Sequence, residues 1–522
     1  MKTIHRFALS TSFIGAASVS CIVAGSVLGC GDGGKTEPTG GTGGAGGNGS
    51  SSTGGSSSSG SAGMGTGGAG GEGTGGGPSA SRCLPGSYDA PAVYVSLSGN
   101  DTNAGTKDAP VRTFAKALEI RSSGQDVRVF GGTYTEKLLV AKSGTADAPI
   151  RVLPVSGEKV VLDATGKAAG KPIEITGAYV HVQGFEAKGS GNQCVDITGS
   201  DVVLCNVDAH DCVSHGIQLG GARIWAEGNA IHNASLENEG ASLGTGWGSG
   251  LKVKVGGDDI TLFRNRAYHN WGEGVCVTRG KNIKILENLS YDNYSVNFYI
   301  DNSFDVLVEK NMATCVPNSG FERDGKPASA FTIGEEYYDG WGAQSHDITI
   351  RNNIAAFCSR GFLFFGSDVV GGLVNVAVVH NTFWGSVDTA ISIAAGVTSG
   401  TVIHNNLVQQ PAGKTVYIES LDGLTVSHNL WVNGIPADWT NGSGMGDVVG
   451  DPLLFKTPGY EAASYRLGDK SLARDKALVL PQPVKEDFEG RVRSVAGSEG
   501  TDMGAMEYGD PSLPCEFDAL WK

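Results

Sequence analysis

The chain has 522 residues, 39 Lys+Arg against 54 Asp+Glu, a formal net charge of −15 and 81 Gly. This acidic balance, without any run of Lys or Arg, argues against a nucleic-acid partner, because the phosphate backbone would repel it. Beyond the extreme N-terminus no stretch approaches 18 uncharged apolar residues, which excludes a membrane-spanning bundle. The length allows one large domain or two ordinary ones.

The first 30 residues have the layout of a secretory signal, since two basic residues precede an apolar run from Phe7 to Leu28. The run ends Val27-Leu28-Gly29-Cys30, which resembles the lipobox of bacterial lipoproteins and implies lipidation of Cys30. The alternative is an ordinary signal with a chance cysteine. Residues 1–30 are therefore expected to be a lipoprotein signal peptide. The protein is expected to be exported and lipid-anchored to the cell envelope, at the outer membrane or the cell surface, with no other membrane contact.

Residues 31–81 are almost entirely Gly, Ser, Thr and Ala, and they lack the apolar area needed to fold. They are predicted to be a disordered linker, whose ~50 residues have a root-mean-square reach of roughly 40 Å. Export allows the cysteines beyond the signal to pair. Their spacing matches no CxxC zinc template, so they are interpreted as disulfides or buried thiols.

From about residue 180 a short pattern repeats: two aliphatic residues one position apart, then an Asn, as in Ile260-Thr-Leu262-Phe-Arg-Asn265. The Asn positions are Asn265, Asn288, Asn311, Asn353, Asn381, Asn406 and Asn429, at steps of 23, 23, 42, 28, 25 and 23. A period near 23 with alternation inside each unit indicates short strands stacked as coils. Because a coil buries its apolar face only against its neighbours, the pattern predicts a parallel β-solenoid with a hydrogen-bonded column of Asn amides.

A second polar column precedes the strands, at Asp201, Asp259, Asn282, Asp305, Asp347 and Asn375. Since these residues recur on nearly every coil, they are predicted to cap turns rather than to bind metal.

Together with the repeat, three segments are similar to bacterial right-handed parallel β-helix proteins of the pectate-lyase-like superfamily: Tyr94–Thr106, Phe130–Glu136 and Asp502–Glu507. The resemblance covers roughly residues 92 to 508. It implies an all-β fold, a right-handed parallel β-helix of about 10 coils over residues 82–434, followed by a C-terminal cap at 435–522. Thr113 to Ile120 has Phe114, Ala117 and Leu118 at helical spacing, which predicts an amphipathic helix that covers the N-terminal end of the stack.

Two coils carry insertions, at Ala234–Ser249 and Val316–Ser329, and such departures from a repeat tend to wall a binding face. On the strands between them, alternation turns one set of side chains outward. This set is Lys252, Lys254, Cys276, Thr278, Tyr299, Asp301 and Thr332, flanked by Arg279, Glu273 and His215. The aromatic residues Trp247, Trp271, Tyr294, Tyr337, Tyr338 and Trp341 border it. Aromatic rings beside mixed charges are typical of a sugar-binding groove. The residues expected to contact substrate are Trp247, Trp271, Glu273, Tyr299, Asp301 and Tyr337.

The predicted substrate is an acidic polysaccharide, and the leading chemistry is β-elimination. That reaction needs a base to remove the proton alpha to the carboxylate and cations to stabilise the developing enolate. Lys252 or Lys254, with a pKa lowered by a neighbouring cation, is the candidate base, and Arg279 a candidate neutralising cation. The alternative is that the lysines are solvated groups between coils and that Asp301 pairs with Lys254 or Arg279.

The resemblance also implies calcium bridging the substrate carboxylate, with Asp208, Asp211 and Glu273 as candidate ligands. No dense Asp cluster accompanies them, which argues against strong calcium dependence. His210, His232 and His269 recur near one turn and predict a surface ladder, with a metal site as the alternative. Cys315 and Cys358 occupy equivalent positions on consecutive coils and are predicted to form a disulfide.

Two other functions stay open. Glycoside hydrolysis needs paired carboxylates, and Asp258-Asp259 and Ser214-His-Gly216 resemble fragments of polygalacturonase motifs, but in reversed order. A non-catalytic glycan-binding or structural surface protein would have the same anchor and linker. The acidic, tethered layout favours a monomer.

Overall fold

A computed structural model of the chain describes residues 80–167, 170–241, 247–338, 345–366, 371–394, 396–410, 414–435, 444–494 and 500–521. The predicted signal peptide with Cys30, nearly all of the predicted linker, and Trp341 lie outside the described residues.

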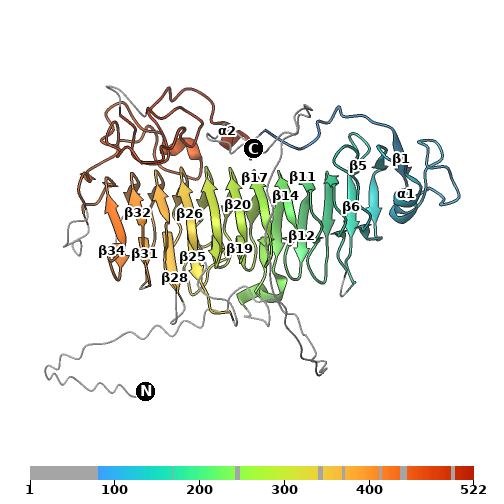
Figure 1. The fold of residues 1–522 in the computed structure, drawn as a ribbon, viewed down its shortest axis with the longest axis horizontal. Coiled ribbons are helices and arrows are strands. Elements are labelled where there is room, and N and C mark those ends of the chain that lie inside the picture. Colours follow the sequence, from blue (N-terminus) through green and yellow to red (C-terminus); the bar gives the residue numbers. More distant parts are fainter. Residues whose placement is uncertain are drawn as a thin grey trace, which may run out of the picture.

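The described strands form three long parallel sheets, and successive coils add one strand to each sheet (Figure 1). Sheets A and B have 13 strands each and sheet C has 11. This is the predicted parallel β-helix, somewhat longer than about ten coils, because the coils before residue 180 lack the Asn pattern from which the repeat was recognised.

Sheet A consists of β1 (Ala92–Val95), β2 (Asp126–Val129), β5 (Ile150–Pro154), β8 (Val180–Gln183), β11 (Val202–Cys205), β14 (Ala222–Glu227), β17 (Asp258–Phe263), β20 (Lys281–Leu286), β23 (Phe304–Glu309), β26 (His346–Arg351), β29 (Ala377–Val379), β32 (Thr401–His404) and β35 (Leu424–Ser427). Sheet B consists of β3 (Gly132–Tyr134), β6 (Val160–Asp163), β9 (Phe185–Lys188), β12 (Asp208–Cys212), β15 (Ala230–Ala234), β18 (Arg266–Tyr268), β21 (Leu289–Tyr291), β24 (Met312–Thr314), β27 (Ile354–Ala356), β30 (Thr382–Trp384), β33 (Leu407–Gln409), β36 (Leu430–Trp431) and β37 (Val448–Val449). Sheet C consists of β4 (Leu138–Val140), β7 (Ile173–Ile175), β10 (Val195–Ile197), β13 (Ile217–Leu219), β16 (Ser249–Val253), β19 (Glu273–Thr278), β22 (Val296–Asp301), β25 (Ser329–Glu335), β28 (Arg360–Gly366), β31 (Thr389–Ile393) and β34 (Lys414–Ile418).

Inside the coils, equivalent apolar side chains stack in register from one strand to the next. On sheet C, Leu251, Val275, Phe298, Phe331 and Phe362 form one such column and are all buried. Burying one side chain of this size contributes about 1.5–3 kcal/mol. The alternation predicted for these strands is thus confirmed, and the core runs along the whole solenoid.

The repeated Asn residues form a continuous amide ladder between sheets A and B. Each side-chain oxygen accepts hydrogen bonds from the backbone and side-chain amides of the equivalent Asn on the coil before it. The Asn311 Nδ2 donates to the carbonyl oxygens of Ile285 and Glu309, at 2.7 and 3.0 Å, and to Asn353 Oδ1 at 3.0 Å. The predicted Asn column is confirmed. Its side chains form hydrogen bonds with backbone groups of the turns that have no partner in the sheets.

The second polar column also has the predicted role. Its members, Asp201, Asp259, Asn282, Asp305, Asp347 and Asn375, all have φ between 51° and 56°. Asp and Asn tolerate this left-handed conformation better than most residues, which explains why they recur where each coil turns into sheet A.

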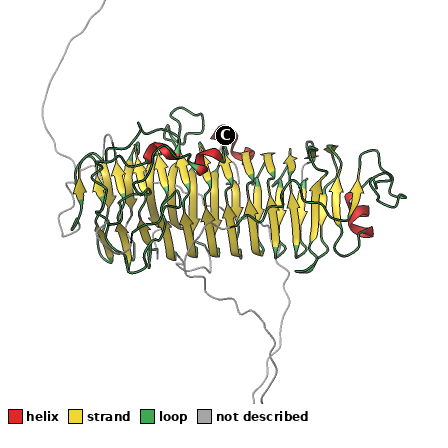
Figure 2. Cartoon of the chain, turned by 90° about the horizontal axis from the view of Figure 1, so that it is seen from above, coloured by secondary structure: helices red, strands yellow, loops and turns green. Residues whose placement is uncertain are grey.

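Helix α1 (Phe114–Ile120) lies at the N-terminal end of the solenoid and buries Phe114, Ala117 and Leu118, as predicted (Figures 1 and 2). The Thr113 side chain accepts from the Lys116 backbone N–H and caps the helix. The remaining helical turns are η1 (Leu236–Ala241), η2 (Ala462–Tyr465) and α2 (Glu516–Ala519). No helix among the described residues is long and apolar enough to span a membrane.

The described C-terminal segment, residues 450–521, packs along the outer face of sheet B instead of across the end of the solenoid, where a cap was predicted (Figure 1). Tyr465, Phe488 and Met506 bury Met312 and Ile354 of that sheet. Sheet B presents these apolar side chains outward, so a segment that covers them along the flank removes more apolar area from water than one that covers only the last coil.

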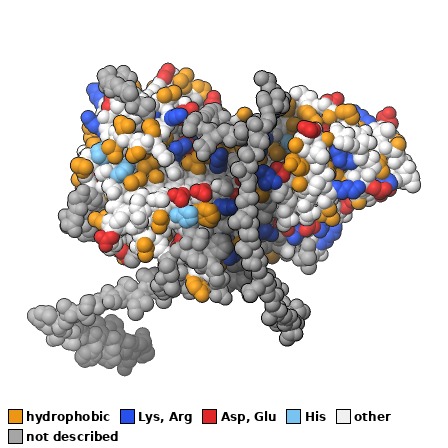
Figure 3. Space-filling model, viewed as in Figure 1, with side chains coloured by type: hydrophobic (Ala, Val, Ile, Leu, Met, Phe, Trp, Pro, Cys, Tyr) orange, Lys and Arg blue, Asp and Glu red, His pale blue; other side chains and the backbone are white. Residues whose placement is uncertain are grey.

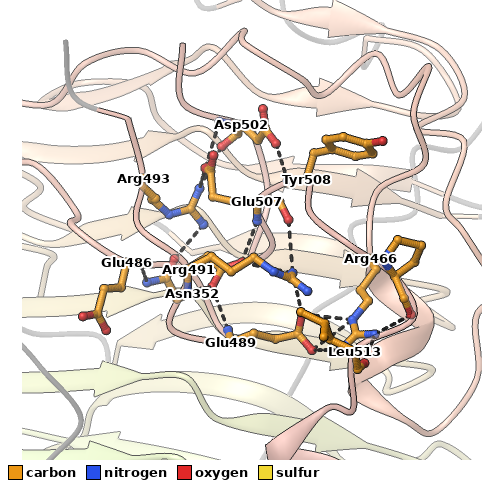
Figure 4. A network of polar contacts seen from close by, with 12 residues as sticks. Asn352, Arg466, Glu486, Glu489, Arg491, Arg493, Asp502, Glu507, Tyr508 and Leu513 are labelled. Atoms are coloured by element: carbon orange, nitrogen blue, oxygen red, sulfur yellow. Dashed lines mark hydrogen bonds and ion pairs between the residues drawn. The ribbon is translucent and has the colours of Figure 1, made fainter. Parts of the chain in front are cut away.

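A buried arginine joins this segment to the coils (Figure 4). The Arg493 guanidinium donates to Glu507 Oε1 at 2.5 Å, to Asn352 Oδ1 at 2.8 Å, and to the carbonyl oxygens of Asp502 and Gly504. The Asp502–Glu507 motif therefore has a structural role, because it supplies most of the acceptors that make burial of this charge possible.

The segment before β1 runs along sheet A. A disulfide joins Cys83 to Cys205, and Leu84 exchanges two hydrogen bonds of 2.9 Å with the Gln183 side chain. A second disulfide joins Cys194 to Cys212. On the face drawn in Figure 3, acidic and basic side chains are interspersed over the described surface.

Replacing Asn311 by Asp tests the ladder. Asn311 is fully buried, and the isosteric carboxylate would face three acceptors in place of donating to them. We expect Asn311→Asp to lower the free energy of unfolding by about 3 kcal/mol or more, measured by urea denaturation. Asn318→Asp, the same substitution at an exposed position, is the control. Equal stability of the two variants would show that the Asn311 hydrogen bonds do not stabilise the fold.

Candidate functional site

Sheet C aligns the outward-facing residues in rows between the two insertions. Lys252 pairs in register with Cys276, Cys276 with Tyr299, and Tyr299 with Thr332. Thr278 lies opposite Asp301 in the same way. The structure therefore brings these side chains together on one face, but it buries them there: Lys252 is 2% exposed and Asp301 is 0% exposed.

An aromatic cluster packs against this face. Trp247, Tyr294 and Tyr299 are buried with Cys276, and Trp271 packs against them. The Trp271 ring also lies 4.8 Å, centroid to centroid, from Phe321 of the second insertion. Tyr337 is 66% exposed and lies outside the cavity that this cluster borders. The predicted sugar-contacting aromatics thus separate into packed residues and one exposed ring.

A cavity of about 500 Å³ opens beside the rows. Glu273 of β19, Asp324 of the second insertion and Glu336, just after β25, contribute carboxylates, and Tyr299 of β22 contributes a phenol. Arg323 and Lys326 of the second insertion and Arg360 of β28 contribute cations, and Trp247 and Phe365 contribute rings. The second insertion therefore forms one wall of this cavity.

Two carboxyl groups, Asp301 and Glu336, meet at the edge of the cavity. The Tyr338 hydroxyl donates to Asp301 Oδ2 at 2.5 Å and lies 3.4 Å from Glu336 Oε2. The Tyr299 hydroxyl donates to Glu336 Oε1 at 2.6 Å. Glu336 lies beyond the end of β25, outside the alternating pattern, so sequence reasoning did not identify it.

This arrangement favours a shared proton. Burial, then the negative charge of Glu336, raises the pKa of Asp301 to about 8, against the opposing effects of the Tyr338 hydrogen bond and the Lys252 charge. Burial also raises the pKa of Glu336. Two like charges this close disfavour double ionisation, so the pair retains a proton more readily than either carboxyl group would alone.

Cations and a neutral histidine surround the pair. Burial, with the positive charges of Lys252 and Lys254, lowers the pKa of His215 well below 6.5, and its Nδ1 accepts from the Ser249 N–H at 2.9 Å. The Arg279 guanidinium lies 4.3 Å from the centroid of the Tyr338 ring, and its backbone N–H donates to the Asp301 carbonyl. Lys254 is half-buried and directly follows β16, the strand that contains Lys252.

The predicted calcium ligands do not form one site. Asp208 and Asp211 lie on β12 in sheet B, whereas Glu273 lies on β19 in sheet C and accepts from Ser249 Oγ at 2.9 Å. The prediction was wrong because each coil contributes a strand to all three sheets, and these carboxylates lie on two different sheets. Asp208 and Asp211 instead contact histidines, with Asp208 Oδ1 3.2 Å from His232 Nε2 and Asp211 Oδ2 2.9 Å from His210 Nδ1.

Two of the three histidines form the predicted ladder on sheet B. The rings of His210 and His232 stack at 4.9 Å, and Tyr268 continues the stack at 4.9 Å. His269 lies outside this stack, and its ring stacks on Phe321 at 5.1 Å. The two fragments considered for hydrolysis are also separated. Asp258 lies on β17 in sheet A, 3.1 Å from Lys281 Nζ, while His215 precedes β13 of sheet C.

Cys315 and Cys358 are joined in a disulfide. Cys315 directly follows β24, and the second insertion begins at the next residue. The disulfide therefore links the start of that insertion to the next coil. The Asn297 side chain donates to both sulfur atoms, at 3.3 and 3.5 Å.

The sequence of the N-terminal coils is similar to that of known β-helix proteins. Residues 93–297 match the sequence model of a family described as Pel9A-like, right handed beta helix region. The chain is 36% identical over 85 residues to pectate lyase PEL9 of Emericella nidulans, covering 16% of this chain and 20% of that protein. It is 28% identical over 184 residues to pectate lyase L of Paenibacillus polymyxa, covering 32% and 40%. The chain thus matches less than half of the length of either relative.

The structure of XylC in complex with xylose superposes with a TM-score of 0.51 at 12% sequence identity, over 80% of this chain and 98% of that one. At this identity the likeness shows the fold alone. The matched region and the three parallel sheets agree with the superfamily predicted from the repeat. Residues 93–297 are thus similar to the Pel9A-like right-handed β-helix family, and the three parallel sheets show that the coils form a parallel β-helix.

Proposed function

We propose that this protein binds an acidic polysaccharide in the cavity beside sheet C and cleaves it by β-elimination. The observation that carries the proposal is the pair of buried Asp301 and half-buried Glu336, both with raised pKa values, beside a cavity whose lining includes three cations and three aromatic rings. Perturbed carboxyl groups at a cavity are typical of acid–base sites. The two pectate lyases that match parts of the chain support a uronate-containing substrate.

In the proposed reaction Glu336 is the base, because it lines the cavity and its raised pKa suits proton removal near neutral pH. It takes the proton alpha to a uronate carboxylate, the electron pair forms the carbon–carbon double bond, and the glycosidic oxygen leaves. Tyr299, which also lines the cavity and is hydrogen-bonded to Glu336, is the proton donor to that oxygen. The cations on the cavity wall neutralise the uronate and stabilise the enolate.

Lys252 has a different role in this proposal from the base predicted from the alternation. It is almost fully buried beneath the carboxyl pair, and its charge lowers the pKa of both Asp301 and Glu336. It is a positioning residue that allows one carboxylate to remain ionised away from water. Arg279 adds positive charge beside Tyr338, the hydrogen-bond donor to Asp301. The proposed reaction contains no calcium-dependent step, because the predicted calcium ligands lie on two different sheets.

The proposal places the protein outside the cell, anchored through Cys30 by the linker. A surface position suits a polymeric substrate that does not cross membranes. The second candidate function, a non-catalytic glycan-binding protein, uses the same cavity and anchor.

Elimination creates a conjugated unsaturated uronate, so near-ultraviolet absorbance tests the proposal. The chain is incubated with pectate, alginate and glycosaminoglycans, with calcium and with chelator. We expect absorbance to rise on one substrate and Glu336→Gln to slow the rise at least about a hundredfold. Lys252→Met should reduce it as well, because the carboxylate loses its stabilising charge. Glu461→Gln, at an exposed glutamate, is the control.

The other outcomes separate the alternatives. A flat trace with retained glycan binding would indicate the non-catalytic binding protein. New reducing ends without absorbance would indicate hydrolysis by the carboxyl pair.

The shared proton also predicts how stability depends on pH. The pKa of Asp301 is about 8 in the folded protein and 3.8 for an unperturbed aspartate. Between these values the folded state retains the proton that the unfolded chain loses, so the free energy of unfolding falls as pH rises through this window. Asp301→Asn removes this titration. We expect its melting temperature, relative to that of the unsubstituted chain, to increase from pH ~5 to pH ~8. A melting-temperature difference that does not change with pH would contradict the raised pKa of Asp301. Asp422→Asn, at an exposed aspartate, is the control.

A further inference from the structure

A cluster of metal-ligating side chains lies on the outer face of sheet B, on a different sheet from the cavity described above. Glu186 of β9 and Asp208 of β12 face one another in register, and His210 lies two residues further along β12. One ligand atom from each of the three side chains lies within 4.8 Å of the other two. Because alternate residues of a strand share a face, the stacking of the coils brings two carboxylates and an imidazole together.

The His210 ring has a carboxylate at each of its nitrogens. Its Nδ1 lies 2.9 Å from Asp211 Oδ2, and its Nε2 lies 3.4 Å from Glu186 Oε1. A neutral imidazole carries one N–H and donates to only one of these oxygens. The shorter contact assigns that proton to Nδ1, so the Nε2 lone pair faces a carboxylate oxygen. Two such acceptors repel one another unless a cation, either a proton or a metal ion, lies between them.

The separation of these two atoms suits a metal ion. In a tetrahedral site with bonds of about 2.0–2.1 Å, two ligand atoms lie about 3.3 Å apart. The observed distance between His210 Nε2 and Glu186 Oε1 is 3.4 Å. One imidazole nitrogen with two carboxylate oxygens suits zinc and similar transition ions, whereas calcium takes about six to eight oxygen ligands. The Asp208 side chain is 47% exposed, so water reaches the cluster and is available as a fourth ligand.

A supporting carboxylate orients the histidine. Asn233 Nδ2 donates to Asp211 Oδ1, while Asp211 Oδ2 faces His210 Nδ1. A carboxylate behind a metal-binding histidine fixes the tautomer and makes the coordinating nitrogen more basic. Cys212, which ends β12, is disulfide-bonded to Cys194, so the strand that carries the histidine is anchored beside the cluster.

Neighbouring side chains also hold the two ligand carboxylates. Lys159 Nζ lies 2.5 Å from Glu186 Oε2, so Oε1 is the oxygen that faces the histidine. His232 Nε2 lies 3.2 Å from Asp208 Oδ1. Arg266 lies two strands beyond Asp208 in the same row of sheet B. The two nearby cations therefore neutralise part of the negative charge, while one oxygen of each ligand carboxylate is held in place by a neighbour.

We propose that Glu186, Asp208 and His210 bind a divalent transition-metal ion of the zinc type, with His210 Nε2 as the nitrogen ligand. The ion joins β9 to β12 through their side chains, so its binding stabilises the fold. The site lies on sheet B and does not depend on the function proposed for the cavity beside sheet C.

Calorimetric titration of the full chain with Zn²⁺, after treatment with chelator, tests the site. We expect one zinc ion to bind at the cluster and Ca²⁺ to bind at least about a hundredfold more weakly. His210→Gln and Glu186→Gln should each weaken zinc binding at least about a hundredfold, because each removes a ligand. Asp211→Asn should weaken it about tenfold, because it removes only the orienting carboxylate. Zinc should also raise the melting temperature of the unsubstituted chain, and this rise should be lost in His210→Gln and Glu186→Gln.

His346→Gln is the control. The His346 Nδ1 lies 2.6 Å from Asp347 Oδ2 on sheet A, and within the described residues this pair is not joined by a third candidate ligand. Melting of each variant in chelator shows whether a loss of zinc binding reflects a loss of fold.

Three outcomes would overturn the site. The first is the absence of saturable zinc binding by the unsubstituted chain, which would assign the cation between His210 and Glu186 to a proton. The second is unchanged zinc binding in both His210→Gln and Glu186→Gln. The third is an equal loss of binding in His346→Gln. Each readout is binding or stability, so none depends on whether the protein cleaves a polysaccharide.

Discussion

The structure depends on the vertical stacking of identical coil positions, which the buried Asn amides enforce. Each amide bonds to its equivalents on both neighbouring coils, so a shift of register would leave several buried donors and acceptors unpaired. With register fixed in this way, residues far apart in sequence become lateral neighbours about 4.8 Å apart. Lys252, Cys276, Tyr299 and Thr332 form a row for this reason alone.

The site arises where the repeat is interrupted. The second insertion and the aromatic cluster cover outward side chains that a regular coil would leave in water. In that environment, charge interactions are stronger than at the surface and a carboxylate is harder to ionise. The raised pKa of Asp301 therefore follows from the same packing that places Glu336 and the basic wall around the cavity.

Similarity to pectate lyases agrees with the fold, but it covers only part of the chain and of those relatives. A β-helix scaffold supports different reactions because the coils supply a rigid face and the insertions supply the chemistry. The C-terminal segment occupies the flank of sheet B through Arg493, Asn352 and Glu507, on a different sheet from the cavity. The flank that stabilises the solenoid and the face that binds a ligand are therefore separate.

The sequence by itself determined the coil repeat, the Asn ladder, the turn column and helix α1, because each follows from a local period or a backbone preference that recurs. It also determined which side chains of β16, β19, β22 and β25 point outward. Only the tertiary structure decided that Lys252 is buried, that Glu336 joins Asp301, that Asp208 and Glu273 lie on different sheets, and that the C-terminal segment follows sheet B. These depend on how irregular segments fold over a regular stack, and no period in the sequence encodes that.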